Sequence, residues 1–287
     1  MVRGVVAFCP GHISGYFKRI IGRDAATTGS IGAGIVISEG VLVRVEPSER
    51  TSVHICRKEK SGALTVVAHD SPPLTYAMNL LSINASVTTE CCLPIGAGFG
   101  LSAAALLATL TALDKLFDLG LAEGDIARAA HESEIVHHTG LGDVAACRGG
   151  GLVVRTTAGI TAPVHRYFNL PEPIYAVSFG PIHTPSVLEA EERMEQVASA
   201  FPNTEPKNIE DFFRCSRVFT QRSGLLTPQV QTVLDRCDEL DVPASMTMLG
   251  NGVFAYGKEA GRVLSQFGLT YDMGVATKEA HIVEVIL

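Results

Sequence analysis

Charged residues are scarce in this 287-residue sequence, and Lys and Arg form no run. Charged side chains make up 18% of the chain, and 23 Lys and Arg against 30 Asp and Glu leave a net charge of −7. Proteins that bind nucleic acid or anionic membranes without specificity need a basic surface. The composition therefore argues against both kinds of partner, although it allows a local basic pocket.

Long hydrophobic segments are also missing. The longest apolar stretch, residues 103–113, is interrupted by Thr109 and Thr111 and is too short to cross a bilayer. The first residues, MVRGVVAFCPG, lack the hydrophobic region of a signal peptide. We therefore expect a cytoplasmic protein, and its 46% of hydrophobic residues predict a large core.

Cysteine and histidine form none of the usual metal or disulfide motifs. The seven cysteines contain no C-x-x-C pair, and the nine histidines are scattered without an H-E-x-x-H motif. An odd number of cysteines without such spacing argues against a disulfide framework and against a structural zinc site. We expect buried thiols and surface imidazoles instead.

The first half of the sequence predicts strands followed by helices. β-Branched and alternating apolar residues predict strands at 2–9, 34–45, 52–57, 63–68 and 83–93, with turns at Pro10-Gly11 and Gly40. The Ala- and Leu-rich segment 101–117 predicts a helix buried on most sides, and 122–138 predicts a second helix.

The second half mixes the two kinds of element. Three prolines within residues 161–173 predict a domain boundary there. Beyond it we expect a hairpin around Gly250-Asn251-Gly252, strands at 174–179 and 282–286, and helices at 186–200, 209–222, 229–239 and 259–267. This order favours an α+β fold with domains at 1–165 and 166–287.

Glycine is concentrated where a predicted strand meets a predicted helix, in the segment PIGAGFGLSA at 94–103. Alternating glycines bring backbone N–H groups close together, and the helix start adds partial positive charge, so the segment can hold phosphates without lysine. A Walker A loop would need Lys after Gly100, and a G-x-G-x-x-G fingerprint lacks its last glycine, although alanine can stand there. A glycine-rich turn without a ligand stays an alternative.

Two acidic residues follow in the next predicted helix and just after it. His131 and Glu134 are three positions apart and share a helix face, and Asp143 follows Gly140-Leu-Gly142. Phosphoryl transfer needs a carboxylate for Mg²⁺ and a group that orients the acceptor hydroxyl. Taken alone, Glu134 is equally consistent with a solvated helix face and Asp143 with a helix N-cap.

The glycine segment and the two acids resemble the signatures of the GHMP superfamily of small-molecule kinases, whose loop has the form P-x-x-x-G-x-G-S/L-S-A-A. The resemblance implies an ATP-binding N-terminal domain like domain 2 of ribosomal protein S5 and a ferredoxin-like C-terminal domain. It implies ATP and Mg²⁺ as cofactors. The residues that it places around the nucleotide are Pro94, Gly96, Ala97, Gly98, Phe99, Gly100, Leu101, Ser102 and Ala103.

The same resemblance assigns roles to single residues. It implies that Ser102 and Glu134 bind Mg²⁺ and that Asp143 is the catalytic base or orients the hydroxyl. Because Leu101 stands where the family usually has a first serine, Ser102 is the one remaining hydroxyl in the pair.

Further segments resemble the archaeal pantoate kinases, one group within this superfamily. They are HISGYF at 12–17, GSIGAG at 29–34, AHESE at 130–134, TGLGD at 139–143 and SMTMLGNGVF at 245–254. This resemblance implies phosphorylation of (R)-pantoate by ATP to (R)-4-phosphopantoate, for coenzyme A synthesis, and allows a homodimer. Residues expected to contact the substrate are Arg155, His131, Ser30 and Thr184.

Other functions stay open at this point. A homoserine or mevalonate type of kinase is the nearest alternative. A relative of the non-kinase ribosylaminobenzene phosphate synthase and a nucleotide-dependent sensor on the same fold are two others. The combined presence of Ser102, Glu134 and Asp143 argues against a sensor, which does not need the full chemical set.

Overall fold

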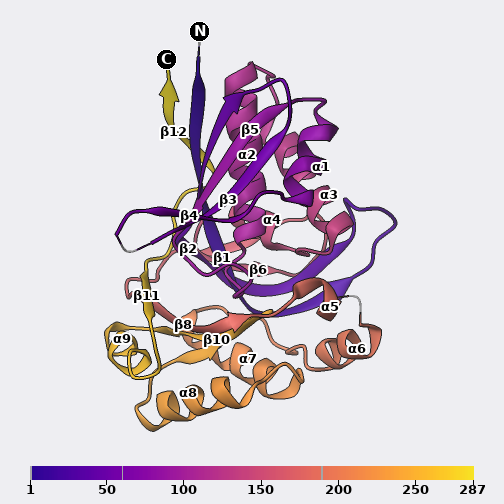
Figure 1. Cartoon of the computed structure of the whole chain (residues 1–287). Coiled ribbons are helices and arrows are strands. Elements are labelled where there is room, and N and C mark those ends of the chain that lie inside the picture. The colour runs from indigo at the N-terminus through magenta and orange to yellow at the C-terminus, as the bar shows by residue number, and fades with distance from the viewer. Residues whose placement is uncertain (1, 60, 189) are drawn as a thin grey trace.

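Two β-sheets organise the chain, and helices cover them (Figure 1). The computed structural model describes all residues except 1, 60 and 189. The larger sheet has the order β12-β1-β2-β5-β3-β4, and β6 pairs with β2 and with β7. Its strands are β1 (Gly4–Ile20), β2 (Gly29–Pro47), β3 (Ser52–Lys58), β4 (Leu64–Ala68), β5 (Ala85–Cys91), β6 (Leu152–Arg155), β7 (His165–Tyr167) and β12 (His281–Ile286).

The first two strands are longer than the sequence predicts, and the turn expected at Gly40 is wrong, because Gly40 lies within β2 and pairs with Pro10 of β1. Strand β1 was expected to end at Pro10-Gly11, which is wrong, because bulges after Pro10 and after Ser14 absorb the irregularity and pairing with β2 continues to Ile20. The long β1–β2 ribbon bends. One end of β2 pairs with β5 and its other end pairs with β6, so the ribbon connects distant parts of the sheet.

Helices pack against the larger sheet around one central helix. Helix α2 (Leu101–Phe117) lies against β1 and β2 and is buried over most of its length, as its Ala/Leu composition predicts. Helix α3 (Glu123–His137), the short α4 (Asp143–Cys147) and α1 (Pro72–Leu80) pack around it. The sequence did not reveal α1, whose two prolines occupy the first turn, where a missing N–H costs nothing.

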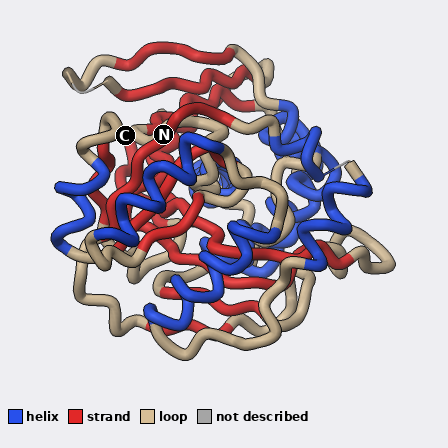
Figure 2. Tube along the Cα trace, turned by 90° about the horizontal axis from the view of Figure 1, so that it is seen from below, coloured by secondary structure: helices blue, strands red, loops and turns tan. Residues whose placement is uncertain are grey.

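The smaller sheet has the order β11-β8-β10-β9. Its strands are β8 (Ile174–Pro181), β9 (Ala244–Met246), β10 (Gly250–Tyr256) and β11 (Thr270–Met273). Strands β9 and β10 form the predicted antiparallel pair, but the turn expected at Gly250-Asn251-Gly252 is wrong, because these residues begin β10 and the chain turns at 247–249. Its helices are α7 (Ile209–Arg222), α8 (Pro228–Glu239) and α9 (Lys258–Leu264), which lie in front of the strands when the molecule is seen from below (Figure 2).

The segment expected as one helix at 186–200 is two helices. They are α5 (Thr184–Leu188) and α6 (Glu191–Ser199), so that part of the prediction is wrong; residue 189 lies outside the described residues. Helix α6 buries Met194 and Val197 and exposes its acidic residues. The break turns the chain from the edge of the cavity described below toward β1.

The predicted α+β class is confirmed, since both sheets mix with helices along the chain. The domain division at 165 and 166 stays a prediction. The final strand β12 returns to pair with β1, so the two chain ends lie side by side (Figure 1). Buried residues from both sheets form one continuous core. No helix in the described part of the chain is long and apolar enough to cross a membrane.

Candidate active site

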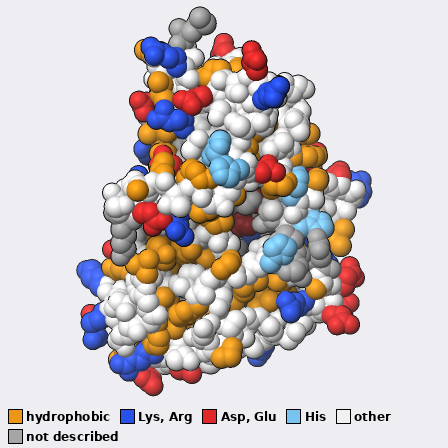
Figure 3. Space-filling model, in the orientation of Figure 1, with side chains coloured by type: hydrophobic (Ala, Val, Ile, Leu, Met, Phe, Trp, Pro, Cys, Tyr) orange, Lys and Arg blue, Asp and Glu red, His pale blue; other side chains and the backbone are white. Residues whose placement is uncertain are grey.

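A cavity of about 670 Å³ lies where the two sheets meet, and it is lined by the glycine segment, α2 and the connection from α3 to α4. Residues of β1, β3, β5 and β6, the starts of α1 and α5, and the turn at Met248 and Leu249 also line it. The space-filling view shows the molecule hollowed on this face, between the parts that carry the two sheets (Figure 3). Most of the residues predicted for the site line this cavity.

The glycine loop adopts a backbone that other residues rarely take. Gly96, Gly98 and Gly100 have φ values of +75°, +83° and +62°. A Cβ atom on Gly98 would lie 2.7 Å from the carbonyl oxygen of Met248, so the close approach also requires glycine. Gly100 precedes α2 without a side-chain cap, which leaves the N–H groups of its first turn free for a ligand. This geometry is suited to phosphate.

The neighbouring strands hold the loop in place by backbone hydrogen bonds. The N–H of His12 donates to the carbonyl of Phe99 at 2.9 Å, and the N–H of Ile182 donates to the carbonyl of Gly96 at 3.1 Å. These two contacts come from different sheets. The loop is therefore fixed to both halves of the fold, and the carbonyls of Gly96 and Phe99 are satisfied by these bonds.

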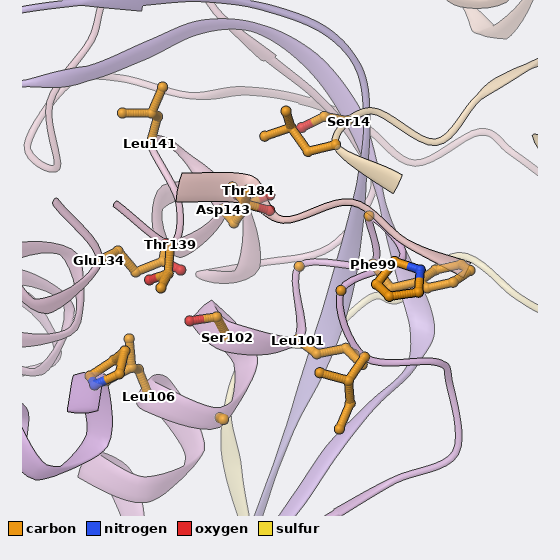
Figure 4. A pocket seen from close by; sticks show the side chains of 18 of the residues that line it. Ser14, Phe99, Leu101, Ser102, Leu106, Glu134, Thr139, Leu141, Asp143 and Thr184 are labelled. Atoms are coloured by element: carbon orange, nitrogen blue, oxygen red, sulfur yellow. The ribbon is translucent and has the colours of Figure 1, made fainter. Parts of the chain in front are cut away.

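Glu134 is buried beside the loop. Its residue surface is 1% exposed, so the alternative of a solvated helix face is wrong. The side chains of Ser102, Thr139 and Glu134 point toward one another (Figure 4). Burial, and then the negative charge of Asp143, raise the pKa of Glu134 to about 8, while the hydroxyls of Ser102 and Thr139 partly offset this.

One oxygen of Glu134 has no protein partner. Its Oε2 atom is buried and makes no hydrogen bond within the described residues. A Cβ atom on Gly140 would lie 2.4 Å from this oxygen, so only glycine leaves room for the carboxylate. A buried acidic oxygen beside the hydroxyl of Ser102 offers the hard ligands that Mg²⁺ prefers. The residues present therefore fit a magnesium ion.

Asp143 is the first residue of α4, and the N-cap position is Gly142, so the N-cap alternative is wrong. Its Oδ1 lies 2.7 Å from Nδ1 of His12 on β1, and 23% of its side-chain surface is exposed. Burial opposes ionisation, but the hydrogen bond from His12 and the positive charge of Arg155 outweigh it and hold the pKa of Asp143 below its usual range.

Arg155 lies at the end of β6, is buried and lines the cavity. It donates through one nitrogen to the carbonyl of Gly142 and through another to the hydroxyl of Ser30 at 3.3 Å. Burial lowers the pKa of its guanidinium, which the charges of Asp143 and Glu134 partly oppose. Arg155 thus places Ser30 and the loop before Asp143 next to each other, and its contact with substrate stays a prediction.

The remaining two predicted residues differ in position. Thr184 begins α5 and lines the cavity, as expected for a substrate contact. His131 is buried and is not among the described residues that line the cavity. Its Nε2–H donates to the carbonyl of Thr28 at 2.9 Å. Its visible role is to hold the connection between β1 and β2, and nothing in its placement supports a substrate contact.

From the sequence, no individual role is assigned to His12 or Thr139, although both belong to the site. His12 stood in a segment whose resemblance was noted, but its partner Asp143 is 131 positions away, so no local spacing could pair them. Thr139 stands in the segment TGLGD, whose resemblance carries no role for it, although it faces Glu134 (Figure 4).

Comparison with known proteins places the chain in a family. The family profile described as the GHMP kinases N terminal domain matches residues 66–151. The pantoate kinase of Methanospirillum hungatei is 46% identical over 272 residues, which are 95% of this chain and 94% of that protein. The chain belongs to the GHMP kinase family.

A further sequence relative and a solved structure are also similar to this chain over most of its length. The pantoate kinase of Methanocaldococcus jannaschii is 29% identical over 88% of this chain and 92% of that protein. A solved structure described as a phosphotransferase related to the CoA biosynthesis pathway superposes with a TM-score of 0.79 at 24% identity, over 98% of both chains. The expected family, its α+β fold and the class of ATP-dependent small-molecule kinase are confirmed.

Proposed function

We propose that this GHMP kinase is a pantoate kinase, which transfers the γ-phosphoryl group of ATP to the 4-hydroxyl of (R)-pantoate. The observation that carries the proposal is a pair of acids, the buried Glu134 and the partly exposed Asp143, beside a glycine loop in one cavity. The identities to two pantoate kinases over nearly the whole chain support the choice of substrate.

The triphosphate lies along the loop Gly96–Gly100 and the start of α2 in this proposal. Backbone N–H groups and the helix dipole neutralise part of its charge, so no lysine is needed there. Ser102 and Glu134 hold Mg²⁺ through oxygen atoms, and Glu134 must lose its proton to do so. Bound there, the ion supplies the charge neutralisation that phosphoryl transfer needs.

Asp143 acts on the acceptor. The oxygen of the 4-hydroxyl forms the new bond to the γ-phosphorus, the bond from that phosphorus to the β,γ-bridging oxygen breaks, and ADP leaves. The hydroxyl proton passes to the carboxylate of Asp143, which is ionised because its pKa lies below the usual range. Removal of that proton and alignment of the hydroxyl are the two tasks of this residue.

The substrate carboxylate needs a cation at a fixed distance from Asp143. Arg155 is the one Lys or Arg among the described residues that line the cavity, and its charge acts on both Asp143 and Glu134. Ser30 shares its guanidinium, and Thr184 faces the cavity from α5. We infer that these three residues orient the anionic end of pantoate, with Arg155 providing the charge.

Phosphorylation assays with alternative alcohols test the proposal. Purified protein is incubated with ATP and pantoate, homoserine or mevalonate, with and without Mg²⁺, and both ADP and the phosphorylated product are measured. We expect Mg²⁺-dependent turnover with pantoate and at most trace turnover with the other two. Faster turnover of homoserine or mevalonate contradicts the substrate assignment. ATP binding without turnover of any alcohol points to the sensor or the non-kinase relative.

A further inference from the structure

His12 is buried against the residue that the proposed reaction uses as its base. It comes from the middle of β1, its side chain is fully buried, and its Nδ1 lies 2.7 Å from Oδ1 of Asp143. An ionised carboxylate can only accept a hydrogen bond, so the imidazole donates its Nδ1–H. The contact therefore fixes which nitrogen carries the proton and which oxygen of Asp143 is occupied.

The second ring nitrogen indicates that His12 is neutral. Its Nε2 is buried and has no hydrogen-bond partner within the described residues. An N–H at this position would be a buried donor without an acceptor, which is unfavourable, and more so when the ring is charged. Burial also lowers the pKa of His12, and this effect outweighs the hydrogen bond to Asp143, which raises it. His12 acts as a fixed dipole and not as a second charge.

The surroundings hold the ring in one position. A Cβ atom on Gly34 of β2 would lie 2.2 Å from Nε2, so the ring fills the space left by that glycine. A Cβ atom on Gly100 would lie 3.0–3.2 Å from the backbone and Cβ of His12. The residue that positions Asp143 thus packs directly against the last glycine of the loop.

Asp143 itself has little other support. It begins a helix of five residues that has no side-chain cap, and the hydrogen bond from His12 is its one side-chain partner within the described residues. Its exposed 23% opens to the cavity. Without His12, the carboxylate could rotate about its side-chain bonds and lose its direction toward an acceptor hydroxyl.

We propose that His12 is the positioning residue of Asp143: its Nδ1–H holds Oδ1, so that the carboxylate presents its other oxygen to the alcohol. The proposal rests on the proposed function, because it takes Asp143 as the group that receives the hydroxyl proton. It predicts an effect on kcat, since substrate and nucleotide do not touch a fully buried imidazole.

Three substitutions separate this role from packing. In H12N the shorter amide places an N–H near the position of Nδ1, whereas in H12Q the longer amide places it near Nε2. H12A removes the donor. We expect H12A and H12Q to lower kcat by about 10- to 100-fold with both KM values close to wild type, and H12N to recover most of the loss. Equal rates for H12N and H12Q, or a loss confined to KM, overturn the proposal.

A double substitution tests the route through Asp143. Adding H12A to D143N should not lower the residual turnover further, because the group that His12 positions is already disabled. A further loss equal to that of H12A alone overturns the proposal. Thermal unfolding of every variant checks folding, and if H12A unfolds, the comparison of H12N with H12Q decides.

These assays use the alcohol that the wild type phosphorylates fastest. Lack of pantoate turnover by the wild type contradicts the proposed function, whereas the order of the His12 variants can be measured with any accepted alcohol. The two failures are therefore distinguishable.

Discussion

The two halves of the site are built in opposite ways. The loop at Gly96–Gly100 acts through its backbone, with three alternating glycines of positive φ and a helix start. The acid cluster acts through side chains from four elements: His12 of β1, Glu134 of α3, Asp143 of α4 and Arg155 of β6. We therefore expect substitutions in the loop to act through its backbone shape, and substitutions in the cluster to act through the chemistry of the side chains.

This difference separates binding from chemistry. Backbone N–H groups cannot titrate or be moved by a single rotamer, so in the proposed function the loop is a fixed receptor for phosphate. The carboxylates have pKa values shifted in opposite directions, upward for Glu134 and downward for Asp143. Environments that drive two acids apart in this way allow one to bind a cation and the other to handle a proton.

The largest effect on turnover is expected from Asp143→Asn, which changes the cluster of side chains and leaves the glycine loop intact. Loss of a positioned base lowers rates by about 10²–10⁴-fold. We therefore expect kcat to fall in that range, while the Kd for ATP measured by calorimetry stays close to wild type, because the loop is intact. Near wild-type turnover of a folded variant would show that Asp143 has no part in the reaction.

Gly98→Ala changes the glycine loop and leaves the side chains of the cluster intact. The new Cβ would lie 2.7 Å from the carbonyl of Met248, at a φ of +83°. We expect the KM for ATP to rise about 10- to 100-fold, which corresponds to about 1.4–3 kcal/mol. Gly62→Ala is the matched control, since Gly62 has a φ of +86° with nothing within 4 Å of a Cβ. An unchanged KM in Gly98→Ala would exclude the loop as the phosphate site.

Arg155→Ala tests whether the cluster also binds the substrate anion. We expect the KM for pantoate to rise about tenfold, as for a lost charged hydrogen bond, and the KM for ATP to change much less. Arg155→Lys keeps the charge but loses the fork that reaches both Gly142 and Ser30, so it should recover only part of the affinity. Equal increases in both KM values would argue against a carboxylate contact.

The smallest effect concerns stability and pH. Because the pKa of Glu134 is raised from about 4.5 to about 8, its contribution to stability is complete below about pH 4.5 and is lost as pH rises through about 8. In Mg²⁺-free protein, Glu134→Gln should therefore gain in Tm over wild type as pH increases from about 5 to about 8. Glu123→Gln, on an exposed position of the same helix, should not. A constant difference would contradict the raised pKa.

The sequence predicts the loop better than the cluster for a physical reason. A phosphate loop is contiguous, so its glycines, the preceding strand and the following helix all stand within residues 85–117. The contact of His12 with Asp143 depends on how β1 packs against α4, which no local pattern encodes. For His131 the local pattern was misleading. It shares a helix with Glu134 at the predicted spacing, but its ring is hydrogen-bonded to the carbonyl of Thr28 and not directed into the cavity.

The fold follows the same rule. Segments with a strong local signal were predicted well: α2 at its observed bounds, from its Ala and Leu content, and the β9–β10 pair apart from the position of its turn. The continuation of β1 through Pro10-Gly11 was not, because a bulge accommodates residues that end most strands. The return of β12 to β1 depends on long-range pairing and is invisible in the local sequence.

A crystal structure with a non-hydrolysable ATP analogue and Mg²⁺ tests the account most directly. We expect the β- and γ-phosphates to accept hydrogen bonds from the backbone N–H groups of Gly96–Ser102, and the ion to bind oxygens of Ser102 and Glu134. Phosphates bound elsewhere in the cavity, or an ion without contact to Glu134, would contradict it.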